Sequence, residues 1–365
     1  MKLIRIFFWH GWNLLKKNIY SVFFLDSFTP IPSNIYIIPS QRCNAKCIMC
    51  LNWREKTPLE LSFETWQLVI DELAYVAPYS KINISGGEIL LPGLLQDIAF
   101  YAARRLPYTG IVTNGFLLNK EMVKKVVAAG FSNVNISIDG NSEKIVNMIR
   151  GREYAYKTTL KAMELLAKEI KRTKSHMKVI IKPIMMGLNF HELPDLVRKV
   201  QKNGLHGVYF QPIEPIYNSK QTFEELKKSS LWIQKKDKFW ASQIIDELIE
   251  MKKSGFPIIN EVVNLEEIKD YFELSEGKNK IFLRRCKIDL SNLFLFHGGG
   301  ISFCESFPSI GNIQKNTIKE ALFSQKAKAQ RKLIRRCRQI NTCLSTCFIQ
   351  KSPLQQMKLF LMLNK

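Results

Sequence analysis

Three cysteines, Cys43, Cys47 and Cys50, lie within eight residues and are spaced CxxxCxxC. They directly follow the apolar run Ile35-Tyr36-Ile37-Ile38. Thiolates are soft ligands, and three of them on one short loop suit an iron-sulfur cluster. Zinc usually requires a fourth ligand close by, and neither the loop nor its immediate flanks supply one. One metal position would therefore stay open, which favours a catalytic centre over a purely structural one.

A second motif, Ser85-Gly86-Gly87-Glu88, follows the next predicted strand. By itself CxxxCxxC could be a chance or zinc motif, but the two motifs together resemble the radical S-adenosylmethionine (radical SAM) enzymes. The resemblance covers roughly residues 34–211. One departure is Met49, because many relatives carry an aromatic residue just before the third cysteine.

The resemblance implies a [4Fe-4S] cluster held by Cys43, Cys47 and Cys50, with S-adenosylmethionine bound at the open iron. In this family the reduced cluster cleaves S-adenosylmethionine, and a 5'-deoxyadenosyl radical then abstracts hydrogen from the substrate. An electron donor such as flavodoxin or ferredoxin is implied as a partner. The lack of side chains at Gly86 and Gly87 would let the backbone approach the methionine amino group of the cosubstrate.

Further candidate residues follow successive predicted strands, where barrels of this kind gather their chemistry. By resemblance, Glu88 fixes the turn after the second strand, and polar residues at later strand ends reach the cosubstrate's ribose and carboxylate. These residues are Thr113 and Asn114 after the third strand, and Ser137 and Asp139 after the fourth. Arg150 resembles a recurring Arg-Gly in relatives and would pair with a carboxylate, although a surface arginine is an open alternative.

Strand and helix patterns alternate from residue 35 onward, which predicts a parallel sheet. Strands are predicted at 35–38, 81–85, 108–113, 133–137, 178–185 and 207–210, and helices begin after Ser62 and over 94–105, 120–129, 155–172 and 193–203. Right-handed connections would curl these repeats into a partial (β/α)6 TIM-type barrel of the α/β class, followed by a small cysteine-rich C-terminal lobe. The predicted domains are an N-terminal segment at 1–33, the barrel at 34–215, a helical connector at 216–280, an auxiliary-cluster domain at 281–350 and a tail at 351–365.

Five more cysteines lie near the C-terminal end, at Cys286, Cys304, Cys337, Cys343 and Cys347. With a predicted hairpin that ends at Cys304, they resemble the auxiliary-cluster (SPASM/twitch-like) extension of many radical SAM barrels. The full form needs further cysteines that this chain lacks, so one auxiliary [4Fe-4S] cluster is expected. The chosen ligands are Cys286, Cys304, Cys343 and Cys347, with Cys337 as the spare thiol. A structural zinc remains the alternative.

The chain of 365 residues carries a net charge of +22. This charge either indicates an acidic partner or belongs to a solvated surface rich in lysine. Cysteine spacing of the metal type and the lack of a secretory signal predict a reducing, cytoplasmic location. The basic, aromatic-rich segment before residue 29 could lie on a membrane surface as a peripheral contact, or pack on the main domain. Aromatic residues at helical spacing favour packing.

The substrate is the least determined part of the prediction. Relatives with the C-terminal extension favour oxidative or epimerising modification of a peptide or protein. A cell-envelope, sugar or lipid precursor is the alternative substrate. A protein of another class, a non-catalytic metal-cluster protein that binds nucleic acid, is less favoured because the basic run at 331–336 lacks interleaved aromatic residues.

Overall fold

A computed structural model describes residues 2–23, 28–54, 59–215, 221–274 and 286–337 of the chain. Its centre is a nine-stranded sheet with the order β11-β10-β9-β1-β2-β3-β4-β5-β7, and β6 pairs with β8 in a second, two-stranded sheet. The strands are β1 (Asn34–Ile38), β2 (Lys81–Ile84), β3 (Thr109–Thr113), β4 (Asn133–Ile136), β5 (Lys178–Ile181), β6 (Ile184–Met185), β7 (Gly207–Val208), β8 (Gln211–Pro212), β9 (Asn292–Phe296), β10 (Gly300–Ser302) and β11 (Gly311–Asn312).

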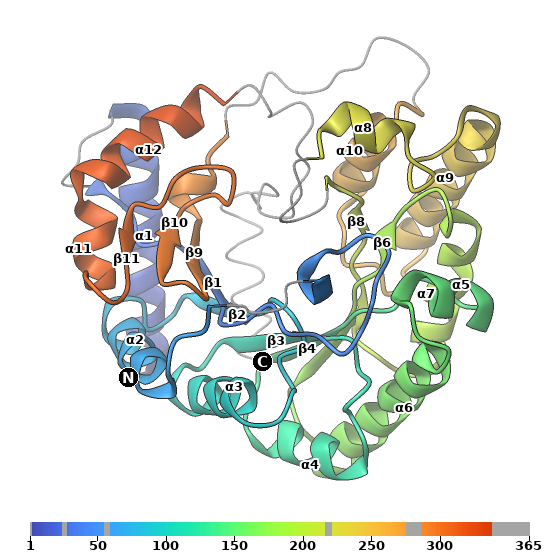
Figure 1. Ribbon diagram of the computed structural model, residues 1–365, viewed down its shortest axis with the longest axis horizontal. Helices are drawn as coiled ribbons and strands as arrows, with labels where there is room; N and C mark the ends of the chain where they lie inside the picture. Colours follow the sequence, from blue (N-terminus) through green and yellow to red (C-terminus); the bar gives the residue numbers. More distant parts are fainter. Residues whose placement is uncertain (1, 24–27, 55–58, 216–220, 275–285, 338–365) are drawn as a thin grey trace.

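Helices cover the outer side of this curved sheet (Figure 1). The α-helices are α1 (Lys2–Phe23), α2 (Phe63–Val76), α3 (Leu94–Arg105), α4 (Lys120–Ala128), α5 (Glu143–Arg150), α6 (Ala155–Thr173), α7 (Leu193–Lys202), α8 (Phe223–Lys228), α9 (Lys238–Lys253), α10 (Val262–Tyr271), α11 (Ile318–Phe323) and α12 (Gln325–Arg335). Short 3-10 helices are η2 (Asn52–Arg54), η3 (Phe190–Glu192), η4 (Lys235–Asp237) and η5 (Ile288–Leu290).

The partial α/β barrel predicted from the sequence is confirmed. Strands β1 to β5 and β7 are all parallel, and each pairs with the next along the sheet. Parallel strands covered by helices bury both faces, which explains why Ile37, Ile84, Ile111 and Val134 are inaccessible to solvent. The carboxyl ends of these strands therefore lie along one edge of the sheet.

The strand predicted at 178–185 is divided into β5 and β6 in the structure. Pro183 lies at the break and has no backbone N–H to donate to a sheet. The next N–H, that of Ile184, donates to the side chain of Asp139 over 2.9 Å. A side chain at the end of β4 thus takes the place of a sheet partner. The helix α5 was not predicted.

The C-terminal hairpin is part of the main sheet. As predicted, β9 and β10 pair antiparallel. In addition, β9 pairs in parallel with β1 along its full length, from Asn34 opposite Asn292 to Ile38 opposite Phe296. The cysteine-rich region predicted as a separate small lobe is therefore joined to the barrel by backbone hydrogen bonds.

Candidate active site

The loop that carries Cys43, Cys47 and Cys50 follows β1 and is held on two sides by backbone hydrogen bonds. On one side, the N–H groups of Lys46 and Ile48 donate to the carbonyls of Arg150 and Ile149 at the end of α5, over 3.1 and 3.0 Å. Because these bonds fix the middle of the loop, the three thiols keep a defined arrangement at the carboxyl edge of the sheet.

On the other side, the loop contacts the turn after β2. The N–H of Gly87 donates to the carbonyl of Ser40 over 3.0 Å, and that of Glu88 donates to Arg42 over 2.8 Å. A Cβ atom at Gly87 would lie 1.8 Å from the Arg42 carbonyl oxygen, so only glycine fits. The pair Gly86 and Gly87 thus lets two backbone segments of this chain pack together. This packing explains the two glycines without the cosubstrate contact that the sequence predicted.

Glu88 is 1% exposed and links three elements of the site. Its carboxylate accepts hydrogen bonds from the hydroxyl of Thr113 (2.7 Å) and from the backbone N–H groups of Leu90 (3.0 Å) and Asn114 (2.8 Å). Burial raises the pKa of Glu88, while these three donors act in the opposite direction. Glu88 therefore fixes the turn after β2 to the end of β3.

Asn114 continues this network to the cysteine loop. Its Nδ2 atom donates to Oδ1 of Asn44 over 2.6 Å and lies 4.0 Å from Sγ of Cys43. The thiol of Cys43 also accepts a hydrogen bond from the N–H of Ala45 over 3.4 Å. Donors aimed at a sulfur stabilise its thiolate form, the form that binds metal.

Asp139 and Arg150 form a buried ion pair beside Cys47. Nη2 of Arg150 lies 2.6 Å from Oδ2 of Asp139, and its Nη1 lies 3.8 Å from Sγ of Cys47. Asp139 is 0% exposed and Arg150 only 7%. The contact of Asp139 with the cosubstrate stays a prediction. Arg150 pairs with a carboxylate as expected, but this carboxylate belongs to the protein.

Burial raises the pKa of all three loop cysteines, that of Cys43 to about 12. Cys47 is buried and Cys43 and Cys50 are half-buried, and thiols with raised pKa values need a cation if they are to become thiolates. Arg150 supplies one positive charge at Cys47, where it acts to lower the pKa. The donor set, three soft sulfurs with a cation and amide donors beside them, fits an iron-sulfur cluster.

In the described part of the chain, no three His, Cys, Asp or Glu side chains form a group that could hold a single metal ion.

The family model described as the Radical SAM superfamily matches residues 37–200, which contain all of these strand ends. This part of the chain is a radical SAM domain. This assignment confirms the resemblance inferred from the two sequence motifs. Members of the superfamily use a [4Fe-4S] cluster together with S-adenosylmethionine.

Curated relatives match parts of this radical SAM protein. PqqA peptide cyclase of Bradyrhizobium diazoefficiens is 26% identical over 170 residues, which are 46% of this chain and 43% of that protein. SkfB, the sporulation killing factor maturation protein of Bacillus subtilis, is 27% identical over 181 residues, 49% of this chain and 42% of that protein. GTP 3',8-cyclase of Helicobacter pylori strain HPAG1 is 30% identical over 202 residues, 52% of this chain and 59% of that protein. The chain thus spans about half the length of these relatives.

Solved structures share the fold over most of the radical SAM chain. Native anSMEcpe with bound AdoMet has a TM-score of 0.61 and 19% identity, over 86% of this chain and 88% of that one. SuiB of Streptococcus suis, bound to the precursor peptide SuiA, has a TM-score of 0.60 and 14% identity, over 86% of this chain and 71% of that one. These likenesses extend the shared fold beyond the residues that the family model matches.

Cys286, Cys304 and Cys337 lie within electrostatic range of one another, outside the segment that the family model matches. Burial raises the pKa of Cys286 to about 12, and the neighbouring Cys304 and Cys337 thiols raise it further. The structure thus groups Cys337, the predicted spare thiol, with two of the predicted ligands. The other two, Cys343 and Cys347, lie outside the described residues.

Two side chains that position the site were missed in the sequence. Asn189 donates from Nδ2 to the carbonyls of Asp139 (2.6 Å) and Ile184 (2.8 Å), and so holds the end of β4. Glu192 accepts hydrogen bonds from the backbone N–H groups of Asn141 (2.7 Å) and Ser142 (3.0 Å). The only signal for these two residues in the sequence was that Asn189 and Glu192 are polar side chains near apolar residues ahead of α7.

Ser137, predicted to contact the cosubstrate, lies at the end of β4 and donates its backbone N–H to the carbonyl of Thr113.

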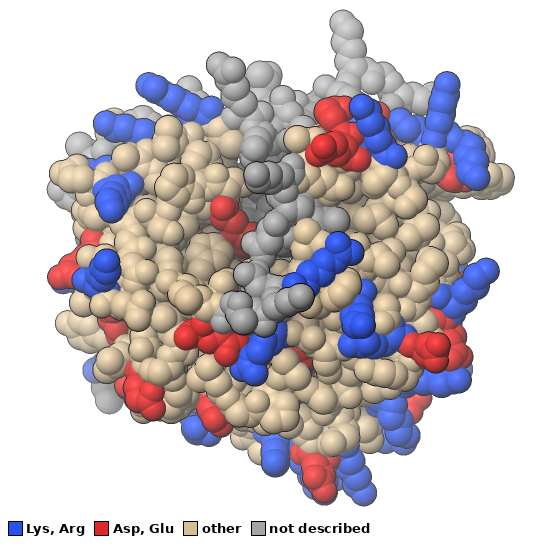
Figure 2. Space-filling view, in the orientation of Figure 1, with Lys and Arg blue, Asp and Glu red and all other residues tan. Residues whose placement is uncertain are grey.

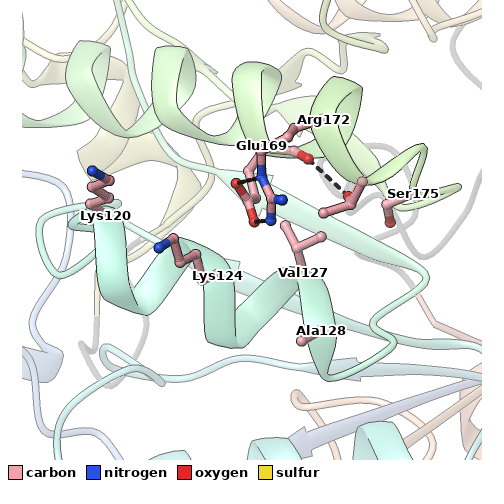
Figure 3. Close-up of a pocket in the computed structure, with 8 residues that line it drawn as sticks. Lys120, Lys124, Val127, Ala128, Glu169, Arg172 and Ser175 are labelled. Atoms are coloured by element: carbon pink, nitrogen blue, oxygen red, sulfur yellow. Dashed lines mark hydrogen bonds and ion pairs between the residues drawn. The ribbon is translucent and has the colours of Figure 1, made fainter.

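A groove between α4 and α6 lies on the outer helical layer (Figure 3). Glu169 and Arg172, three residues apart on α6, pair over 2.6 Å on one side of it, and Lys120 and Lys124 of α4 line the other. None of its lining residues comes from the strand ends described above, so it is separate from the candidate active site.

On the face seen in Figure 2, basic side chains are scattered and acidic ones lie among them.

Proposed function

We propose that this protein is a radical SAM enzyme that modifies a peptide or protein by oxidation or epimerisation. The observation that carries the proposal is the network at the carboxyl edge of the sheet. There one buried carboxylate, Glu88, and one buried ion pair, Asp139 with Arg150, hold a loop with three cysteines. The residues proposed to hold the [4Fe-4S] cluster are Cys43, Cys47 and Cys50. Such a cluster, with S-adenosylmethionine bound, supplies a 5'-deoxyadenosyl radical.

The protein's own residues would orient and insulate the cluster. Arg150 places a positive charge near Cys47 and is itself held by Asp139, whose carboxylate is fixed by the N–H of Ile184. A cation beside a cluster sulfur favours the more negative, reduced state. Asn114 donates toward Cys43 and ties the loop to β3 through Asn44. We expect Ser137, Gly86 and Gly87 to offer the remaining polar contacts to S-adenosylmethionine.

Relatives and structural neighbours support a peptide substrate. PqqA peptide cyclase is named for a peptide and SkfB for maturation of the sporulation killing factor, and anSMEcpe and SuiB have been solved with peptides bound. A small-molecule substrate is the second candidate, because GTP 3',8-cyclase of Helicobacter pylori is 30% identical over 202 residues. With either substrate class, we expect an external electron donor such as flavodoxin or ferredoxin to reduce the cluster.

We further propose one auxiliary cluster in the C-terminal region. The Cys304 and Cys337 thiols act to raise the pKa of Cys286, and the Cys337 thiol acts to raise that of Cys304. Each comes from a different part of the fold, before η5, after β10 and after α12. A cluster held there would accept an electron from a substrate radical, which suits an oxidative reaction.

Anaerobic reconstitution followed by iron and sulfide analysis tests the chemistry. We expect about eight irons per chain and release of 5'-deoxyadenosine when dithionite is added. About four irons with release would remove the auxiliary cluster and leave the radical SAM assignment intact. Absence of release at every iron loading would overturn the enzymatic proposal.

Deuterium transfer tests the substrate class. The reconstituted protein is incubated with S-adenosylmethionine and with short peptides encoded beside its gene, prepared with deuterated side chains. Deuterium in the released 5'-deoxyadenosine, with a mass change in the peptide, is the expected result. Transfer from a nucleotide or sugar precursor under the same conditions, with none from any peptide, would favour the second candidate.

A further inference from the structure

The helix α1 presents a large apolar surface to solvent. Its side chains of Ile4, Phe7, Phe8, Trp12 and Leu15 are between 47% and 68% exposed. At 100° per residue these positions fall on one face of the helix. A helix on the surface of a soluble domain normally shows polar residues on this outward face. The pattern of α1 is therefore the reverse of the usual one.

The opposite face of α1 is fixed to the protein, so the helix is a structured element. The side chain of Asn13 exchanges two hydrogen bonds with the backbone of Ile31, over 2.7 and 2.8 Å. Trp9 packs edge-on against Tyr79 with ring centroids 5.8 Å apart, and Tyr20 is 3% exposed beneath Arg331. Rotation of the helix to bury its outward face would break these contacts.

The charges of α1 have one sign. The helix contains Lys2, Arg5, Lys16 and Lys17 and no aspartate or glutamate. Arg5 is exposed and Lys16 half-buried. Burial lowers the pKa of His10 to about 4, so His10 adds no charge at neutral pH. Cations beside an apolar, aromatic face match the interfacial region of a bilayer that contains anionic lipids.

No helix in the described ranges is long and apolar enough to cross a membrane. A helix with these properties would lie in the plane of the interface rather than span the bilayer. We propose that α1 is a peripheral anchor that docks this protein on an anionic lipid surface, with Ile4, Phe7, Phe8, Trp12 and Leu15 inserted among the lipids. The sequence pattern alone had favoured packing of this segment, and the structure shows both a packed face and a free one.

The position of α1 determines how the docked protein is oriented. Along its length α1 passes the starting ends of three strands, with His10 beside Lys81 of β2, Asn13 bonded to Ile31 ahead of β1, and Lys17 beside Asp289 ahead of β9. In Figure 1 the helix lies at the left, behind β9 and β10. The cysteine loop lies at the opposite, carboxyl edge. Docking through α1 would therefore leave the candidate active site facing the aqueous side.

Another exposed aromatic pair provides a matched control. Phe239 and Trp240 on α9 are 64% and 68% exposed, about as much as Phe8 and Trp12. Unlike α1, however, α9 contains the acidic residues Asp246, Glu247 and Glu250. If exposed aromatic residues alone caused lipid binding, both helices would contribute equally.

The test is sedimentation of the reconstituted full-length protein with vesicles of phosphatidylcholine alone and of phosphatidylcholine mixed with phosphatidylglycerol. We expect binding to the mixed vesicles that weakens with salt. The double substitution Phe8→Ser/Trp12→Ser should reduce partitioning by about tenfold or more, since it removes two aromatic side chains from the inserted face. The pair Arg5→Glu/Lys16→Glu should also reduce binding to the mixed vesicles, whereas Phe239→Ser/Trp240→Ser should leave it unchanged.

Equal loss in the α1 and α9 variants, or no binding by the unmodified protein, would overturn the proposal. So would self-association that disappears with Phe8→Ser/Trp12→Ser in the absence of lipid, because the apolar face would then be covered by a second copy. Release of 5'-deoxyadenosine by each variant is measured in parallel. Unchanged release shows that the variants are folded and separates this proposal from the proposed enzymatic function.

Discussion

The two groups of cysteines in this protein are held in different ways. Cys43, Cys47 and Cys50 occupy one loop, and backbone hydrogen bonds from α5 and from the turn after β2 fix that loop. Cys286, Cys304 and Cys337 lie before η5, after β10 and after α12, and the fold brings them within electrostatic range of one another. The cysteines of the first group are thus close together in the sequence, and the fold only fixes their loop. The cysteines of the second group are brought near one another by the tertiary structure alone.

This difference predicts that the first group is indispensable. Replacement of Cys43, Cys47 or Cys50 with Ala should reduce dithionite-driven release of 5'-deoxyadenosine to background, because a three-ligand cluster has no ligand to spare. Release is measured by chromatography after reconstitution. Substantial release by any of the three variants would contradict the ligand assignment. Ile48→Ala, on the same loop but with no thiol, is the control.

Arg150 sharpens the comparison because its positive charge acts on the first group alone. Arg150→Met should destabilise the fold by about 3–5 kcal/mol, since it leaves Asp139 buried without its partner. The double substitution Arg150→Met/Asp139→Asn should regain most of this loss in urea unfolding. Its rate of S-adenosylmethionine cleavage should nevertheless stay about 10–100-fold below normal, as for other groups next to metal ligands. A normal rate in the double variant would show that the ion pair serves stability only.

Support of the first loop by α5 can be tested at Gly151. This residue has φ 62°, and a Cβ atom there would lie 2.3 Å from the Lys46 carbonyl oxygen. Gly151→Ala should therefore lower the free energy of unfolding by about 1–3 kcal/mol and reduce iron loading of the loop. Gly204 has φ 64° but nothing within 4 Å of its Cβ position. Gly204→Ala measures the backbone strain alone, and equal effects of the two substitutions would argue against the contact with Lys46.

The second group should be separable from the first. Cys286→Ala or Cys304→Ala should lower iron by about four atoms per chain while uncoupled cleavage of S-adenosylmethionine continues. Cys337→Ala should have the same effect, since this thiol lies within electrostatic range of the other two. Unchanged iron in Cys337→Ala would return this residue to the role of spare thiol. Loss of all iron in any of these variants would show that the two groups form one unit.

Local patterns in the sequence predicted the barrel and the cysteine loop because both are encoded by neighbouring residues. The periodicity of buried strands and the spacing of Cys43, Cys47 and Cys50 are visible without tertiary structure. The direction of the Arg150 side chain is not, because it depends on Asp139 at the end of another strand. The burial of Asp139 in turn depends on the break at Pro183, which exposes the N–H of Ile184 to it.

Long-range contacts account for the remaining differences. The pairing of β9 with β1 joins residues that are more than 250 positions apart, and no local pattern encodes that register. Likewise, the aromatic residues of α1 indicated a helix with an apolar face, but only the structure shows that Asn13 and Tyr20 face the protein while Phe8 faces away.

The pairing of β1 with β9 also has a consequence for biosynthesis. While the chain emerges from the ribosome, β1 has β2 on one side, but its other edge stays unpaired until residue 296 has been made. Unpaired edges of hydrophobic strands promote aggregation, and contacts between distant residues form slowly. We therefore expect nascent chains that stop before β9 to depend on chaperones for solubility. The last third of the polypeptide would then complete the barrel as well as contribute its own cysteines.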